Sequence, residues 1–320
     1  MKHSMPVTII FLLLFVVAQI VGLFLVNMSI EGIKKVDGQI QIAFADTVVG
    51  ERPQTTGWES LLYVVVGVAL GTLVLLFLAK NKKINLWKLW FLLAVWVSIS
   101  LAIGALLGGI TPWLPWILAL GLALWKIYYQ NIYIQNVTEI LMYSGMAVLL
   151  VPILSLWVMV VILILFSIYD AYAVWKSKHM VTLAKFTIDA NVFPGLSIPY
   201  SVSKSNKTKI HAKIGNTRVP QPPKLAKKSS KSENKTGVLG GGDVVFPLLF
   251  AGSIMLDLMK KGFSKVIAFN YSLIVVVGAT LALLYLFSIS KKDKFYPAMP
   301  FISTGCFLAY GVIVLLTQVL

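Results

Sequence analysis

Two aspartates in otherwise apolar stretches are the residues of this chain most able to do chemistry. Asp170 lies near the end of one apolar segment, and Asp243 follows a run of glycines at the start of another. An ionisable side chain inside a membrane is costly unless it has a partner, so each is a candidate functional residue. Two carboxylates that meet in a medium of low dielectric constant cannot both ionise, and they share a proton. Such a pair can serve as general acid and general base, which indicates hydrolysis by an activated water.

The composition indicates a membrane protein. Of 320 residues, 58% are hydrophobic and 12% are charged, and the mean hydropathy is +0.85. This leaves too little polar surface to cover a soluble globule. The single cysteine, Cys306, excludes an internal disulfide and any site built from several cysteines, and the three histidines lack metal-ligand spacing. We therefore expect neither a metal nor a cofactor.

Nine stretches approach the length of about 20 apolar residues that a membrane helix needs. The sequence thus predicts an all-α polytopic membrane protein with nine transmembrane helices. A tight helical hairpin is expected where Pro152 separates the fifth helix from the sixth. The predicted helices cover approximately residues 7–26, 61–79, 86–109, 115–126, 132–152, 154–175, 238–258, 266–289 and 296–320.

Lysines follow the second, fourth, sixth and eighth predicted helices, which marks that side as cytoplasmic. The N-terminus is then cytoplasmic and the C-terminus extracytoplasmic, although Lys260, Lys261 and Lys265 fall in an outer loop against this rule. The chain divides into a membrane bundle (1–175), a basic and partly disordered cytoplasmic loop (176–237) and a second membrane part (238–320).

The cytoplasmic loop 176–237 carries 13 lysines and arginines against two acidic residues. Its second half is rich in proline, serine and lysine, which is typical of a solvated, disordered linker. Its charge favours contact with the anionic headgroups of membrane lipids. Binding of nucleic acid would require interleaved aromatic residues, which are sparse, so we expect no nucleic-acid partner.

Helix direction brings the two aspartates to a similar depth. The sixth helix runs toward the cytoplasm and the seventh away from it, so Asp170 and Asp243 both lie just inside the cytoplasmic face, although 72 residues separate them. Asp257 lies 14 residues beyond Asp243. That is about 21 Å along a helix, so Asp257 cannot join the pair. Glu139, near the cytoplasmic end of the fifth helix, is expected to extend to water.

The glycines before Asp243 fit a role in substrate access. Gly240, Gly241 and Gly242 carry no side chains, so a substrate backbone could approach closely, and the start of the helix could loosen. Irregular backbone at membrane depth is tolerated where it lines a wet cavity.

Three function classes remain open on the residues alone. A pair of membrane aspartates can hydrolyse a substrate, relay protons in an ion- or proton-coupled transporter, or form a structural hydrogen bond in a non-catalytic scaffold. Inverted repeats would favour the transporter, but the two halves of the chain show no such symmetry by eye.

Three motifs in fixed order resemble the presenilin and signal-peptide-peptidase family of intramembrane aspartyl proteases, most closely its archaeal members. The stretch YDAYAVWKSKHMVTLA at 169–184 also resembles family sequence, and the resemblance covers essentially the whole chain. The motifs are Tyr169-Asp170, the GxGD signature Gly240-Gly241-Gly242-Asp243, and Pro297-Ala298-Met299 where the family has PAL.

The resemblance implies a presenilin-like fold and an aspartic endopeptidase with Asp170 and Asp243 as its catalytic residues. Its substrates would be single-span membrane proteins, unwound near the two carboxylates, and its location an archaeal cell membrane. The oligomeric state stays open. Tyr169 and residues 297–299 would support the active site, and an extended substrate strand would pair with backbone at 236–239. Met299 replaces the leucine of the family, a change of similar volume that the element is expected to tolerate.

Overall fold

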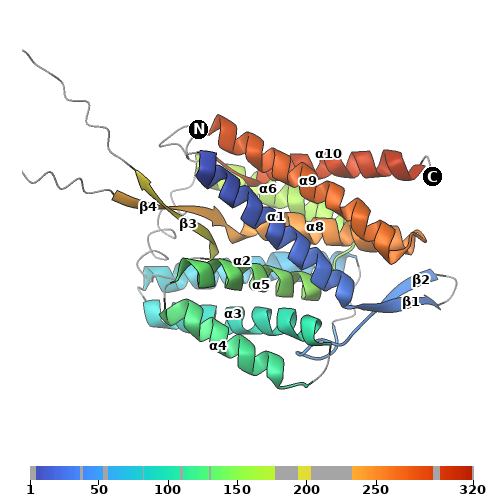
Figure 1. The fold of residues 1–320 in the computed structure, drawn as a ribbon, viewed down its shortest axis with the longest axis horizontal. Coiled ribbons are helices and arrows are strands. Elements are labelled where there is room, and N and C mark those ends of the chain that lie inside the picture. Colours follow the sequence, from blue (N-terminus) through green and yellow to red (C-terminus); the bar gives the residue numbers. More distant parts are fainter. Residues whose placement is uncertain are drawn as a thin grey trace, which may run out of the picture.

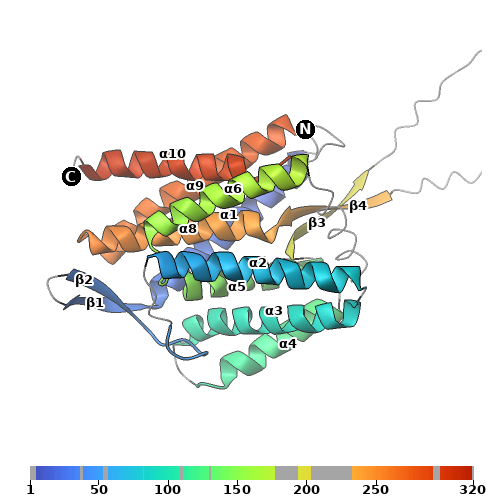
Figure 2. The same ribbon diagram turned by 180° about the vertical axis from the view of Figure 1, so that it is seen from behind.

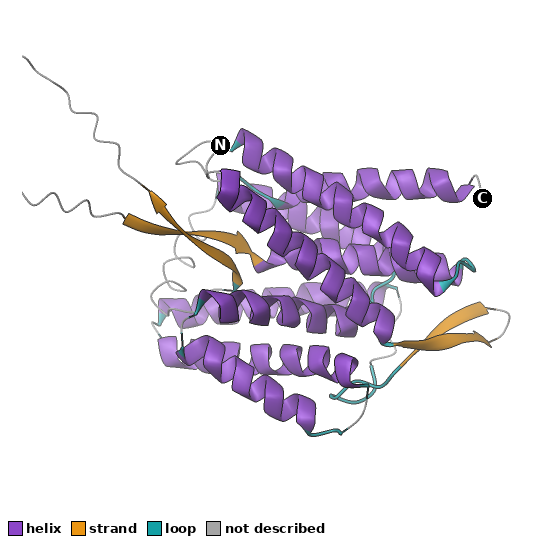
Figure 3. Cartoon of the chain, in the orientation of Figure 1, coloured by secondary structure: helices purple, strands orange, loops and turns teal. Residues whose placement is uncertain are grey.

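Helices dominate the structure, with two small two-stranded sheets at its ends (Figure 3). The computed structural model describes residues 5–36, 39–52, 57–81, 83–108, 111–129, 131–176, 194–202, 233–290 and 296–318. The described helices are α1 (Met5–Met28), α2 (Trp58–Lys80), α3 (Ile84–Leu107), α4 (Leu114–Tyr128), α5 (Ile132–Leu150), α6 (Leu156–Trp175), α8 (Gly241–Lys260), α9 (Lys265–Ile289) and α10 (Met299–Gln318). The described strands are β1 (Ile30–Val36), β2 (Gln39–Phe44), β3 (Gly195–Val202) and β4 (Glu233–Gly240).

The helices form a bundle whose long axes lie roughly side by side (Figures 1 and 2). Helices α2 to α5 lie on one side, and α6, α9 and α10 lie on the other. Helices α1 and α8 lie between these groups and contact both. Helix α8 is the most buried of the long apolar helices, whereas α2 is the most exposed.

The nine predicted helices correspond one to one to the nine helices of the described residues. Seven of these are long and apolar enough to cross a membrane by length and composition. Helix α4 has 15 residues, which is about 22 Å and shorter than a hydrocarbon core of about 30 Å. Helix α5 has 19 residues but carries several polar side chains. The structure therefore supports a polytopic membrane protein and leaves nine crossings as a prediction.

The two small sheets were not predicted, so the expectation of a purely helical protein was incomplete. Strands β1 and β2 pair antiparallel directly after α1, within the stretch expected to be an outer loop. Strands β3 and β4 pair antiparallel from Gly195↔Gly240 to Val202↔Glu233. Strand β4 crosses the boundary placed at 237/238, so the chain from Val238 to Gly240 is extended rather than helical. Glycine is a poor helix former, which is consistent with a helix start delayed to Gly241.

The chain begins and ends at opposite ends of the bundle. Helix α1 starts at the end where β3 and β4 lie, and α10 finishes at the end toward which β1 and β2 project (Figures 1 and 2). This arrangement agrees with termini on opposite faces of a membrane. Which face is cytoplasmic remains a prediction from the lysine pattern.

Two glycines let α9 and α10 approach each other closely. A Cβ added to Gly278 would lie 2.6 Å from the carbonyl oxygen of Gly305, so neither position has space for a side chain. Close backbone approach at small residues is a common way to pack membrane helices. The contact fixes α10 against α9 and thereby places the start of α10, which bears the third motif.

Candidate active site

Asp170 and Asp243 occupy facing surfaces of α6 and α8. The rings of Phe166 and Phe246 pack with their centroids 4.4 Å apart and join the two helices. Phe166 precedes Asp170 by four residues and Phe246 follows Asp243 by three, so each aspartate lies one turn from this contact on the same helix face. The two carboxylates interact electrostatically. The structure thus brings together two residues that are separated by 72 others in the chain.

Helix α10 completes the site through its first residues. The backbone amide of Met299 donates a 3.1 Å hydrogen bond to Oδ2 of Asp170, and the amide of Ala298 also points toward this carboxylate. One turn away, the hydroxyl groups of Ser167 and Ser303 form a 2.8 Å hydrogen bond between α6 and α10. These contacts fix the orientation of the Asp170 carboxylate.

The two carboxylates stay accessible and have no cationic partner in the part of the chain that the structure describes. Asp170 and Asp243 are both half-buried. Among the described residues, lysine pairs with Glu139 and with Asp257 but with neither of these aspartates. No group of three or more histidine, cysteine or acidic residues in the described ranges could hold a metal ion. Because neither carboxylate is neutralised by a lysine or arginine of the described residues, both can interact with a bound molecule.

The glycines before Asp243 differ in their surroundings. Gly240 is the N-cap of α8, and a Cβ there would lie 3.2 Å from Oδ2 of Asp243. A Cβ on Gly241 would lie 3.0 Å from the hydroxyl oxygen of Tyr143. Gly242 is exposed, and a Cβ there would meet only ordinary contact with Phe246. A side chain at Gly240 or Gly241 would thus press against a neighbouring side chain, whereas Gly242 leaves an open surface beside Asp243.

Strands β3 and β4 lead directly into the site. The backbone of Ser197 in β3 exchanges two 2.9 Å hydrogen bonds with the side chain of Asn136 on α5. Gln135, also on α5, donates a 3.2 Å hydrogen bond to the carbonyl of Gly195. The outer edge of β3 is thus covered by α5 at two alternate residues, and the next alternate residue is Pro199, which has no amide hydrogen.

Comparisons with known proteins agree with this arrangement. The family model "Signal-peptide peptidase, presenilin aspartyl protease" matches residues 12–319. The chain belongs to this family. Two solved structures, each described as a presenilin family intramembrane aspartate protease, have the same overall fold. The structure in space group C222 shares 18% sequence identity with this chain, and the two superpose with a TM-score of 0.56 over 94% of each chain. The structure in space group P2 shares 19% sequence identity with this chain, and the two superpose with a TM-score of 0.59 over 95% of this chain and 96% of the other.

A search among curated proteins found no match to the chain. Membership of the signal-peptide peptidase and presenilin family therefore rests on the family model, and the fold likeness supports it. The matched range, residues 12–319, includes Asp170, the glycines before Asp243 and residues 297–299.

Other predicted site residues flank the aspartates. In this family member Pro297 and Met299 are buried, and Ala298 is half-buried at the start of α10. Tyr169 neighbours Asp170 on α6, but its side chain is 58% exposed and turns to another face of the helix. Its role in supporting the site stays a prediction.

The expectation that Glu139 extends to water was wrong. Its side chain is completely buried and forms an ion pair at 2.5 Å with Lys126 of α4, whose side chain is 2% exposed. Gln135 donates a further 3.0 Å hydrogen bond to the same carboxylate oxygen. The sequence carried a signal that was missed, because Lys126 and Glu139 lie at the facing ends of two helices joined by a short turn.

Tyr143 connects this buried pair to the candidate active site. It is 1% exposed and lies beside both Glu139 and Asp243. Its hydroxyl group lies next to Gly241, where an added Cβ would approach it to 3.0 Å. A charged pair at one end of α5 is thus in contact, through one side chain, with the start of α8.

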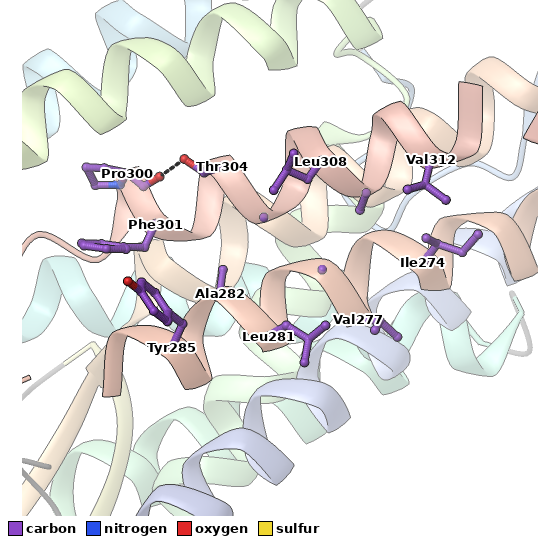
Figure 4. Close-up of a pocket in the computed structure, with 13 residues that line it drawn as sticks. Ile274, Val277, Leu281, Ala282, Tyr285, Pro300, Phe301, Thr304, Leu308 and Val312 are labelled. Carbon is purple, nitrogen blue, oxygen red and sulfur yellow. Dashed lines mark hydrogen bonds between the residues drawn. The ribbon is translucent and has the colours of Figure 1, made fainter. Parts of the chain in front are cut away.

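A separate apolar groove of about 670 Å³ runs between α9 and α10 (Figure 4). Pro300 and Phe301 lie at one end, and Ile274 and Val312 lie at the other. The hydroxyl of Thr304 already donates to the carbonyl of Pro300 at 2.7 Å. The groove holds neither aspartate, so it is not the candidate active site.

Proposed function

We propose that this chain is an intramembrane aspartyl endopeptidase that hydrolyses peptide bonds within membrane-spanning segments of other proteins. The observation that carries this proposal is the facing pair Asp170 and Asp243, which is half-buried and has no cationic partner among the described residues. Family membership supports the same chemistry. A proton-relay function would use the same pair, but nothing else in the described structure favours it.

The reaction uses both carboxyl groups and one water molecule. With one proton shared by the pair, the ionised carboxylate takes a proton from water as the water oxygen attacks the scissile carbonyl carbon. The protonated carboxyl donates its proton to the carbonyl oxygen. In the second step the roles reverse, the C–N bond breaks, and the departing nitrogen receives a proton. The hydrogen bond from the Met299 amide holds the Asp170 carboxylate in place during both steps.

The direct test is cleavage of a model substrate with one apolar segment of about 20 residues by the purified protein in detergent. Asp170→Asn and Asp243→Asn should each abolish cleavage, since asparagine keeps the shape and cannot exchange a proton. Cleavage by either variant at the rate of the unmodified protein would refute the pair mechanism.

The outer edge of β4, which pairs with no other strand of the described residues, is the place we propose for substrate binding. Ser197 pairs with Val238, and the backbone groups of Ser197 point to α5. In an antiparallel ladder, residues opposite each other direct their backbone groups the same way, either inward or outward. Val238, and Thr236 two residues before it, therefore present their backbone groups at the outer edge of β4. An unwound substrate strand can pair there and run toward Asp243.

A proline substitution tests this edge. Val238→Pro removes one outward amide hydrogen, and an edge position tolerates proline without loss of the β3–β4 pairing. We expect the KM of the model substrate to rise at least about tenfold, which corresponds to about 1.4 kcal/mol of binding. Val238→Ala is the matched control and should bind substrate normally. An unchanged KM in Val238→Pro would show that the substrate does not pair with β4 at this residue.

We further propose that the N-terminus is cytoplasmic and that α8 runs outward in an archaeal cell membrane. Lys261 then lies on the outer face, and its side chain is 54% exposed. Lys261→Cys should react with a membrane-impermeant maleimide added to intact cells, with little background because Cys306 is buried. Reaction only after cell lysis would reverse the topology.

A further inference from the structure

Gln19 of α1 is a polar side chain in the buried interface between α1 and α8. Its exposed fraction is 0%. Its amide nitrogen Nε2 donates a 2.7 Å hydrogen bond to the carbonyl of Val244, the residue that follows Asp243. Its amide oxygen has no hydrogen-bond partner among the described residues. A half-satisfied buried amide destabilises a fold, so the bond to Val244 is the contribution that this side chain makes.

This hydrogen bond reaches the first turn of α8, where the helix has fewer hydrogen bonds of its own. Pro247 lies inside this helix. Because proline has no amide hydrogen, the carbonyl of Asp243, four residues earlier, loses its usual helical partner, and the proline ring crowds that carbonyl. The glycines that precede Asp243 add backbone freedom on the other side. The turn that carries Asp243 is therefore held less firmly by its own helix than a regular turn would be.

Helix α1 packs closely enough to hold this turn. Gly22 lies one turn beyond Gln19, and a Cβ at Gly22 would approach the Cγ atom of Leu248 to 3.1 Å. Phe15 and Ala18, on the same face of α1, are both completely buried. In membrane helices a neighbouring helix commonly supplies the hydrogen bonds that a proline removes. Gln19 does not replace the bond lost at the Asp243 carbonyl, but it adds one from across the interface to the carbonyl of the next residue, Val244.

We propose that Gln19 is a positioning residue, whose hydrogen bond to the Val244 carbonyl holds the first turn of α8 so that Asp243 faces Asp170. This inference rests on the proposed function, because it assigns Gln19 a part in the reaction of that pair. Gln19 touches no reacting group and acts through the backbone of Val244.

The test begins with Gln19→Met in the full-length protein, assayed with the model substrate in detergent. Methionine has a similar length and volume but no hydrogen to donate. We expect kcat to fall at least about tenfold while KM stays within about twofold, because binding at the β4 edge is unaffected. A kcat equal to that of the unmodified protein would overturn the proposal.

Ser253→Ala is the matched control. Ser253 is also buried, and its hydroxyl donates to the carbonyl of Leu249 at 3.0 Å within α8. Its loss removes a buried side-chain bond to the backbone of the same helix, ten residues from Asp243. We expect kcat and KM within about twofold of the unmodified protein.

A second arm separates positioning from general destabilisation. Pro247→Ala returns an amide hydrogen to the carbonyl of Asp243, so the first turn of α8 is supported by its own helix. In that background Gln19→Met should lower kcat by less than about threefold relative to Pro247→Ala alone. An equal loss in both backgrounds would show that Gln19 does not act through this turn.

Hydrogen exchange provides a readout that does not depend on activity. In Gln19→Asn, whose shorter side chain cannot reach Val244, the amides of residues 241–246 should exchange faster than in Ser253→Ala. Unchanged exchange would contradict the proposal even if Gln19→Met fails to fold. If Asp170→Asn and Asp243→Asn are inactive while Gln19→Met cleaves normally, only this inference fails. If the aspartate variants cleave normally, the proposed function itself fails.

Discussion

The two ends of α8 each carry an aspartate, and their surroundings are opposite. Asp257, in the last turn, forms a 2.7 Å ion pair with Lys261, the C-cap residue of the helix. Asp243, in the first turn, has no cation among the described residues and lies beside Asp170 instead. The same residue type is thus a surface charge at one end and, in the proposed mechanism, half of an acid–base pair at the other. Position in the fold, not residue type, determines which aspartate can do chemistry.

The backbone also differs between the two ends of α8. The last turn of α8 is regular and passes into a turn at Gly262, whose φ of 96° favours glycine. The first turn contains Gly241 and Gly242, precedes Pro247 and is contacted by α1, α5 and α6. We infer that the end that does chemistry is the end that its own helix stabilises least.

The largest expected difference between the two ends is in activity. Asp243→Asn should lower the cleavage rate at least about a thousandfold, the upper range for loss of general acid–base catalysis, whereas Asp257→Asn should change it less than about twofold. Both rates are measured with the same substrate and protein preparation. A large loss in Asp257→Asn would show that the two ends are not functionally distinct.

The buried pair of Lys126 and Glu139 provides a third carboxylate for the comparison, one that is buried and paired. Lys126→Met leaves Glu139 buried without its cation, so the free energy of unfolding should fall by about 3–5 kcal/mol. Unfolding by increasing amounts of a denaturing detergent measures the loss.

The double variant Lys126→Met with Glu139→Leu is the control for this pair. It removes both charges, so it should recover most of the lost stability. A double variant as unstable as Lys126→Met would show that packing, not the unpaired charge, accounts for the loss.

These residues also mark how far sequence reasoning reaches. The helices and the pairing of Asp170 with Asp243 were predictable, because hydropathy is a local signal and alternating helix direction fixes depth. The pairing of β3 with β4 joins segments more than 30 residues apart, and the register depends on contacts with α5 that no local pattern encodes. The burial of Glu139 depends on how α4 and α5 rotate about their axes, which a weakly amphipathic apolar sequence does not determine.

A smaller effect is expected at the open glycine of the first turn. Gly242→Leu should raise KM about tenfold, about 1.4 kcal/mol, because the new side chain occupies exposed space beside Asp243. Gly311→Leu on α10 is the control, since a Cβ there meets nothing within 4 Å. Equal KM values in the two variants would contradict a role of Gly242 in substrate access.

The smallest effect is expected at the opposite end. The hydrogen bond to Asp257 is the main cause that raises the pKa of Lys261 above its ordinary value of 10.5. This stabilisation is complete below pH 10.5 and is lost as the pH rises through the higher pKa of the folded protein. Because the pair is exposed, Lys261→Ala should lower stability at neutral pH by only about 0.3–0.5 kcal/mol. A loss above about 1 kcal/mol would make this end structurally important as well.

The mass spectrum of the cleavage products tests the central claim most directly. The unmodified protein is incubated with the single-span substrate in water enriched in a heavy oxygen isotope. We expect a cut inside the apolar segment, heavy oxygen in the new C-terminal carboxylate, and no products from Asp170→Asn or Asp243→Asn. A cut outside the apolar segment, or the same products from either variant, would contradict that claim.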